Sequence, residues 1–156
     1  MRDTPAAKGS RKMRLTTRTN LAMRTLMFCA VNTGRTVRKH EVAEACNASE
    51  NHLAQVIHLL AQKKFLRTVR GRSGGLTLGR PAESITVGEV FREFESVLPF
   101  TECSAGAENH CPLVSACRLK CVLEDALRAF YDQLDRVSVA DLVAGNGELQ
   151  TLLKVA

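Results

Sequence analysis

The amino-acid sequence predicts a mainly α-helical protein with one short β-hairpin and a long C-terminal helix. Three observations support this fold class. Apolar residues recur at helical spacing over 16–63, with interruptions at 34–38 and 47–49. A glycine-rich segment, 71–75, separates two short runs of residues that favour strands. Apolar residues follow helical spacing again over 115–134, which is long enough for a single extended helix.

The first part of the chain contains a helix-turn-helix pattern. A first helix begins near Thr16, whose hydroxyl suits an N-cap, and ends before Gly34. A short helix over 39–46 follows, and Ser49 is placed to cap the next helix, over 50–63. Two short helices joined by a tight turn form this motif, although the same pattern also occurs as an ordinary hairpin in a helical core.

The predicted hairpin favours the first interpretation. Strands are expected at 65–70 and 76–78, and the glycines between them allow positive φ and a close approach of the backbone to a ligand. Arg70 and Arg72 bracket the tip. A basic hairpin directly after the second helix of such a motif is a wing, so the sequence predicts a winged helix-turn-helix.

After the hairpin, a cysteine-containing segment separates one predicted helix from the C-terminal helices. An amphipathic helix is expected at 85–95, and a capped short helix beginning after Ser138 precedes an apolar tail. We predict a disordered tail at 1–12 and a winged helix-turn-helix unit at 13–95. A cysteine segment at 96–117 follows, and a long dimerisation helix with its C-terminal tail occupies 118–156.

The charge distribution indicates a nucleic-acid partner. Residues 1–80 carry 16 basic and 4 acidic side chains, a net charge of +12, whereas residues 81–156 carry 6 and 12, a net charge of −6. A basic half that also holds a helix-turn-helix is typical of proteins that bind the phosphate backbone.

The composition also excludes several classes. No apolar run approaches the roughly 18 residues of a membrane span, and the N-terminus lacks the apolar region of a secretory signal. We therefore expect a cytoplasmic protein whose thiols are kept reduced. The sequence has no C-x2-C pair, phosphate-binding glycine loop or paired catalytic carboxylates, so we do not expect an enzyme.

Cysteines provide the candidate cofactor site. Cys103, Cys111 and Cys117 lie in one polar stretch, and Cys121 follows one helical turn later. Thiolates are soft ligands that suit zinc or iron–sulfur clusters. Zinc sites usually use close pairs, whereas gaps of seven and five residues favour a bulkier iron–sulfur cluster. Zinc, a disulfide switch and unliganded thiols remain the alternatives. We interpret Cys29 and Cys46 as packing residues, and His110 as a solvated side chain.

Three segments together resemble a known family. They are M-R-L-T-T-R-T-N-L-A-M-R at 13–24, V-R-G-R-S-G-G-L-T-L at 69–78, and C-x7-C-P-L-x3-C-R-L at 103–119. These segments resemble the winged-helix regulators of the BadM/Rrf type, and the likeness extends over about 13–155. It implies a repressor that binds a palindromic site on double-stranded DNA, as a homodimer with crossed C-terminal helices and one iron–sulfur cluster per subunit.

The resemblance also implies an effector and a ligand set. The C-terminal run L-D-R-V-S-V-A-D-L-V is most similar to the nitric-oxide sensors called NsrR, whereas the cysteine spacing and Asn20 are similar to the iron sensors called RirA. Three ligands of a 4Fe-4S or 2Fe-2S cluster would be Cys103, Cys111 and Cys117. For the fourth, Asn20 of the partner subunit stands where an NsrR-type aspartate would. Cys121 is the local alternative to Asn20, and an iron site ligated by water or a small molecule is a third.

Carried over by position, the resemblance assigns two kinds of DNA contact. Three side chains of the helix over 50–63 would read bases together with the arginines of the wing, and three near the start of the first helix would hold phosphates. These residues are Asn51, His52, Gln55, Arg70 and Arg72 for the bases, and Thr16, Arg18 and Thr19 for the phosphates.

Overall fold

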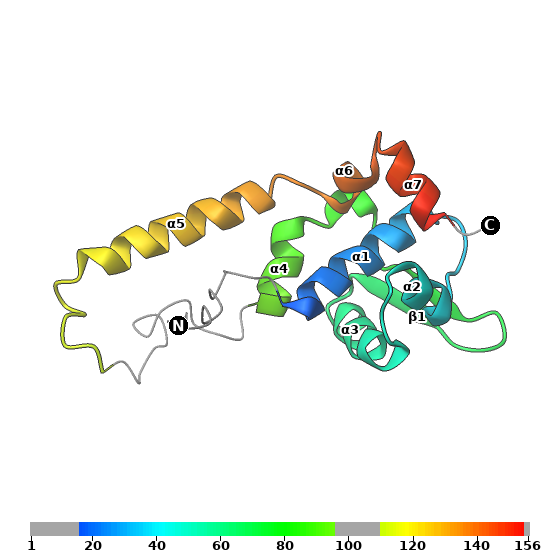
Figure 1. The fold of residues 1–156 in the computed structure, drawn as a ribbon, viewed down its shortest axis with the longest axis horizontal. Helices are drawn as coiled ribbons and strands as arrows, with labels where there is room; N and C mark the ends of the chain where they lie inside the picture. The colour runs from blue at the N-terminus through cyan, green and yellow to red at the C-terminus, as the bar shows by residue number, and fades with distance from the viewer. Residues whose placement is uncertain (1–15, 96–109, 155–156) are drawn as a thin grey trace, which may run out of the picture.

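A computed structural model describes residues 16–95 and 110–154. The expected tail at 1–12 and the predicted ligand Cys103 lie outside these residues. The elements in chain order (Figure 1) are α1 (Thr17–Val31), α2 (Lys39–Ala45), α3 (Glu50–Gln62), β1 (Leu66–Val69), β2 (Gly75–Leu78), the 3-10 helix η1 (Ala82–Ser84), α4 (Val87–Glu95), α5 (Arg118–Leu134), α6 (Val139–Val143) and α7 (Gly147–Leu153). The mainly α-helical fold with a small hairpin is confirmed.

Helix α1 is the centre of the hydrophobic core. The Thr16 hydroxyl accepts a hydrogen bond from the Thr19 amide (3.2 Å), which caps the helix as expected. Leu26 and Phe28 on its inner side are almost fully buried. Helices α3, α4, α6 and α7 all pack against α1, so a single core joins the two ends of the chain.

The α2–α3 turn has the tight geometry of a helix-turn-helix. Asn47 takes a positive φ of 48°, a left-handed conformation that asparagine tolerates better than most side chains. The Ser49 hydroxyl accepts a hydrogen bond from the His52 amide (3.3 Å), which confirms the predicted cap of α3. Leu53, Val56 and Leu60 are completely buried, and they fix the orientation of α3 on the core.

The hairpin is anchored to the chain that precedes α2. Strands β1 and β2 are antiparallel, and Val37 adds a bridge to Leu76 through two backbone hydrogen bonds of 2.9 and 2.7 Å. Gly75 is required there, because a Cβ atom would lie 2.4 Å from the Val37 carbonyl oxygen. Gly71 at the tip has a φ of +105°, which glycine adopts without strain.

Helix α5 projects away from the body, whereas α6 and α7 return to it (Figure 1). Val139 in α6 is fully buried, and the Asn32 side-chain amide donates to the Leu153 carbonyl of α7 (2.8 Å). The apolar tail therefore completes the core around α1, although the sequence grouped it with the dimerisation helix. No helix of the described ranges is long and apolar enough to cross a bilayer.

Two helices begin later than the periodicity predicts. The helix expected from 85 begins at Val87, because Ile85 and Val87 make backbone hydrogen bonds of 2.8 Å with Val139 and Val137. The long helix begins at Arg118 and not at 115, because Cys117 has an extended backbone (φ −79°, ψ 105°).

Candidate nucleic-acid interface and cysteine segment

The outer face of α3 carries polar side chains. Asn51 and Gln55 are exposed, and His52 is half-buried beside the cap of the helix. The opposite face of α3 is fixed in the core. An exposed polar helix face held on a rigid body is the arrangement that winged-helix proteins place in the major groove.

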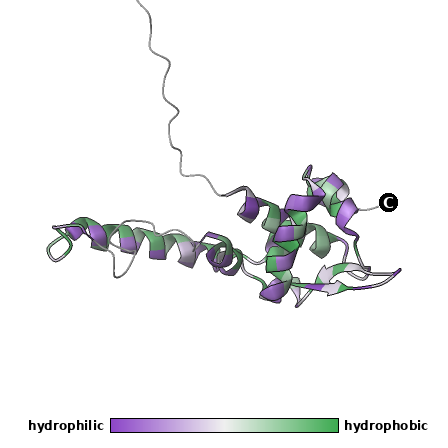
Figure 2. Cartoon of the chain, turned by 90° about the horizontal axis from the view of Figure 1, so that it is seen from below, coloured by the Kyte–Doolittle hydropathy of each residue, from purple (hydrophilic) through white to green (hydrophobic). Residues whose placement is uncertain are grey.

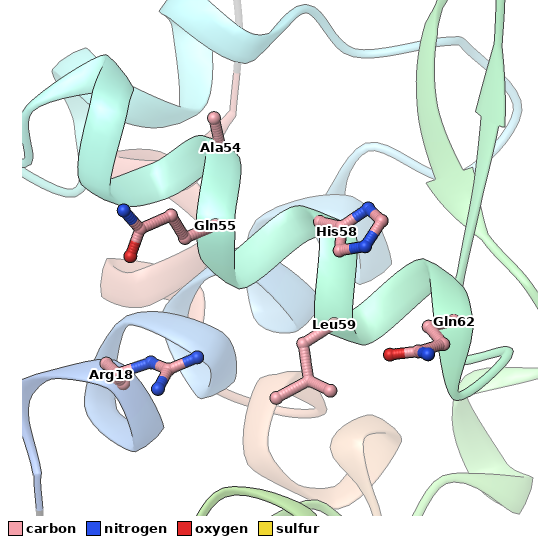
Figure 3. Close-up of a pocket in the computed structure, with 6 residues that line it drawn as sticks. All are labelled: Arg18, Ala54, Gln55, His58, Leu59 and Gln62. Carbon is pink, nitrogen blue, oxygen red and sulfur yellow. The ribbon is translucent and has the colours of Figure 1, made fainter.

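A shallow hollow of about 540 Å³ lies between α1 and α3 (Figure 3). Arg18 of α1 stands across it from Gln55 and Leu59 of α3. His58 and Gln62 also line it and are exposed, and neither is among the residues predicted from the sequence. Their spacing of three and seven residues from Gln55 places them on the same face, and this signal could have found them.

The wing lies on the same body as α3. Arg70 and Arg72 are exposed at the tip of the hairpin. The Arg38 guanidinium, just before α2, donates to the Arg72 carbonyl oxygen (2.9 Å) and fastens the tip to the helix-turn-helix. Arg38 has no local sequence signal for this contact, since its partner lies 34 residues away along the chain.

Thr19, which the sequence predicts to hold a DNA phosphate, faces the interior of the protein. The residue is fully buried, and its hydroxyl donates to the carboxylate of Glu95. The Thr16 amide and hydroxyl donate to the same carboxylate oxygen, at 2.9 and 3.0 Å. A DNA phosphate could not reach Thr19 without displacing Glu95. Arg18 is exposed and remains the candidate phosphate contact near the start of α1.

These hydrogen bonds tie the last residue of α4 to the first turn of α1. Burial alone would raise the pKa of Glu95, but the bonds from Thr19 and Thr16 outweigh burial and hold this pKa below its ordinary value. Because the folded pKa is depressed, the carboxylate stabilises the fold above its unfolded pKa. That contribution is lost as the pH falls through the lower, folded value.

Replacing Glu95 with alanine is expected to lower the free energy of unfolding by about 1–3 kcal/mol at neutral pH, because a buried hydroxyl loses its acceptor. The matched control is Glu93→Ala, which removes an exposed ion pair with Lys63 (2.6 Å) and should cost less than about 1 kcal/mol. Urea titrations at neutral and acidic pH measure both effects, and the Glu95→Ala loss should shrink in acid. Equal losses in the two variants would contradict this prediction.

Two cysteines are core residues. Cys29 in α1 and Cys46 at the end of α2 are each 4% exposed. Burial raises the pKa of Cys29 to about 12, and burial also raises the pKa of Cys46. Both side chains stay neutral thiols at physiological pH, so they are poor metal ligands. Their packing role follows the expectation from the sequence.

The remaining described thiols lie outside the core, before and at the start of α5. Cys111 is half-buried in a turn closed by a hydrogen bond from the Val114 amide to its carbonyl (3.3 Å). Cys117 occupies the N-cap of α5 without capping it through its side chain, and Cys121 is exposed one turn later. His110 is exposed as well. The donor set is therefore soft and accessible, which suits iron–sulfur or zinc chemistry.

The described thiols are not gathered around a common point. Over 16–95 and 110–154, no three cysteine, histidine or acidic side chains are close enough together to hold a metal ion. Asn20 is exposed on α1, where it lines a second hollow, of about 300 Å³, together with Arg24 and His52. The core residue Cys46 lines the same hollow, whereas Cys111, Cys117 and Cys121 do not.

Helix α5 has two distinct faces. Leu119, Val122 and Phe130 are 62%, 61% and 41% exposed, and no residue of the helix is buried. Each residue of an α-helix is rotated by about 100° from the last. Leu119, two residues from both Cys117 and Cys121, therefore lies on the opposite side from them. Figure 2 shows hydrophobic residues along one side of α5 and hydrophilic residues along the other.

Comparisons with known proteins agree with this architecture. The chain is 38% identical over 142 residues to the transcriptional regulator NsrR of Bacillus licheniformis, which covers 90% of this chain and 99% of the relative. It is 38% identical to NsrR of Bacillus subtilis over 92% of this chain and 99% of the relative. It is also 40% identical to protein aau3 of Rhizobium meliloti, over 90% of this chain and 92% of the relative.

Solved structures show the same fold. A structure of T. potens IscR matches with a TM-score of 0.69 and 25% identity, over 91% of this chain and 94% of that protein. The global cysteine regulator CymR of B. subtilis matches with a TM-score of 0.64 and 22% identity, over 85% and 98%. The Rrf2 family model, described as an iron-dependent transcriptional regulator, matches residues 15–145. The chain therefore belongs to the Rrf2 family of transcriptional regulators, which are not enzymes.

Proposed function

We propose that this protein is a homodimeric repressor whose binding to a palindromic operator depends on an iron–sulfur cluster and responds to nitric oxide. One observation carries the proposal. The cysteine segment begins directly after Glu95, which is tied to α1, and ends at Cys117, where α5 begins. It therefore joins the DNA-binding body to the helix with the uncovered apolar face. The NsrR relatives support nitric oxide as the signal.

DNA is read by α3 and by the wing. Amides such as those of Asn51 and Gln55 suit the edge of adenine in the major groove, and His52 flanks them. Arg70 and Arg72 enter the neighbouring minor groove or pair with guanine, and Arg18 holds a phosphate. The exposure of all these side chains, apart from the half-buried His52, supports the assignment.

The dimer is formed along α5. An apolar stripe of Leu119, Val122 and Phe130 is exposed to solvent on a helix that leaves the body. Burying such a stripe against a second copy stabilises a symmetric pair, and α5 then crosses its partner. Two α3 helices are thereby presented to half-sites about one DNA turn apart.

Thiolates of Cys103, Cys111 and Cys117 would hold the cluster, and either Cys121 or Asn20 of the partner subunit would complete the set. When bound, the group would supply iron atoms that react with nitric oxide. The thiolates would then hold the two ends of the cysteine segment at a fixed separation, and they would no longer do so once released. A shift of a few kcal/mol between two dimer arrangements is enough to empty the operator.

The test is a nitric-oxide titration of protein purified without oxygen. Iron, sulfide and visible absorbance are measured first, and operator binding is then followed by fluorescence anisotropy. We expect a coloured protein that releases its operator as nitric oxide is added. Gln55→Ala is the control, because it should weaken operator binding by about 1–3 kcal/mol and leave the absorbance unchanged.

Two outcomes would replace this proposal. If iron removal releases the operator and nitric oxide does not, the protein is an iron-responsive regulator, as its cysteine spacing and Asn20 would favour. If the protein is colourless, holds one zinc ion per chain and binds its operator fully, it is a zinc-stabilised transcription factor.

A further inference from the structure

The base of α5 is attached to α4 by a bidentate ion pair. The Arg92 guanidinium donates from Nη1 to Oδ1 of Asp135 (2.6 Å) and from Nη2 to Oδ2 (2.7 Å). Two parallel bonds fix the relative orientation of the groups as well as their separation. This pair therefore restrains the direction of α5 in a way that a single contact would not.

Aromatic contacts reinforce the same joint. The Arg92 guanidinium lies 4.5 Å from the ring centroid of Tyr131, one turn before Asp135. The Phe91 ring of α4 contacts the Phe130 ring of α5, with 6.3 Å between the centroids. Arg92, Tyr131 and Asp135 are called the α5 clamp below. Hydrogen bonding to Asp135 raises the pKa of Arg92, and the same bonds lower the pKa of Asp135, so both stay charged.

Gly88 of α4 leaves space for the carboxylate of Asp135. A Cβ atom on Gly88 would lie 1.9 Å from Oδ1 of Asp135, so any larger residue would push this carboxylate away from α4. The adjacent chain is also held, since the Val87 amide donates to the Val137 carbonyl (2.8 Å). The end of α5 is therefore fixed on the first two turns of α4.

The other end of α4 is fixed to the DNA-reading elements. Glu93 pairs with Lys63 at the end of α3 (2.6 Å), and Glu95 accepts hydrogen bonds from Thr16 at the start of α1. Helix α4 thus forms a strut between α5 and the part of the molecule that carries α3. The direction of α5 relative to α3 depends on this strut.

We propose that the α5 clamp sets the angle between α5 and the DNA-binding body, and thereby selects the half-site spacing that the dimer accepts. The inference rests on the proposed dimer. A 17-residue helix is about 25 Å long, so a tilt of roughly 10° at its base moves the far end by about 4 Å. That displacement is close to the 3.4 Å rise of one base pair along a DNA strand.

The test compares operators whose half-sites are moved apart or together by one or two base pairs. The wild-type dimer should bind one spacing best and lose about tenfold in affinity for each base pair of misfit. Arg92→Ala should bind the whole series within about threefold, because its α5 helices no longer leave the body at one angle. Arg92→Lys, which keeps the charge without the two parallel bonds, should lie between these profiles and serves if Arg92→Ala does not fold.

The matched control is Arg128→Ala, whose arginine pairs with Asp125 within α5 (3.2 Å). It should keep the wild-type profile. Light scattering is used to check that each variant is still a dimer, and absorbance is used to check that it still holds its cluster. If dimeric Arg92→Ala and Arg92→Lys both retain the wild-type spacing preference, the clamp does not set it. If the wild-type protein itself prefers no spacing, the proposed palindromic dimer is wrong, and the inference fails with it.

Discussion

Replacing Cys111 with serine is expected to give a protein that folds normally but holds no iron–sulfur cluster and has lost most of its operator affinity. A serine hydroxyl is a much harder and weaker ligand than a thiolate, so one of the three ligands from the cysteine segment is removed. We expect operator affinity to fall by about 100-fold or more, since the population shift involved is several kcal/mol. The melting temperature should barely change, because Cys111 lies in a turn outside the hydrophobic core.

The control is the corresponding change in the core. Cys29→Ser places a hydroxyl at a site that is only 4% exposed, and this should cost about 1–3 kcal/mol of stability. That variant should keep its iron, its sulfide and its response to nitric oxide. The two variants are compared by iron and sulfide analysis, thermal unfolding and anisotropy. A Cys111→Ser protein that retains sulfide and binds with wild-type affinity would show that Cys111 is not a ligand.

Introducing a charge into the apolar stripe of α5 is expected to separate the subunits. Val122→Asp should give a folded monomer, because Val122 is 61% exposed in the single chain but would be buried in the proposed dimer. A monomer reaches only one half-site at a time, so operator affinity should fall by about 10²–10⁴-fold. Light scattering measures the mass, and anisotropy measures the affinity.

Arg128→Asp is the matched control, because it introduces the same carboxylate on the opposite, polar side of α5, where the side chain is 70% exposed. This variant should remain a dimer and show a smaller loss of affinity. A dimeric Val122→Asp protein would place the subunit interface elsewhere on the molecule.

The local parts of the fold could be predicted from the sequence. Ser49 ends a turn and begins a helix, and the glycines at 71–75 lie between two short strands, so the helix-turn-helix and the hairpin each have their own signals. Contacts between distant residues had no such signal. Thr19 lies 76 residues from Glu95, and helical spacing shows that a threonine faces inward but not what it meets there.

For the candidate site, too, the sequence predicts the local features but not the contacts between distant residues. The exposed face of α3 follows from its periodicity, and the soft-ligand character of the cysteine segment follows from its composition. The α5 clamp could not be predicted from the sequence, since Arg92 and Asp135 are 43 residues apart and their pairing depends on the crossing of two helices. How the thiols meet one another depends on Cys103, which lies outside the described residues.

The opposite faces of α5 have a consequence for how regulators of this kind diverge. Cys111 precedes α5, and Cys117 and Cys121 lie on the side of the helix opposite Leu119, so substitutions that exchange these thiols do not alter that apolar residue. A lineage could therefore acquire a different effector, or lose the need for one, while its subunits continue to associate and its target promoters stay the same. The effector to which such a regulator responds could then change independently of the promoters that it binds.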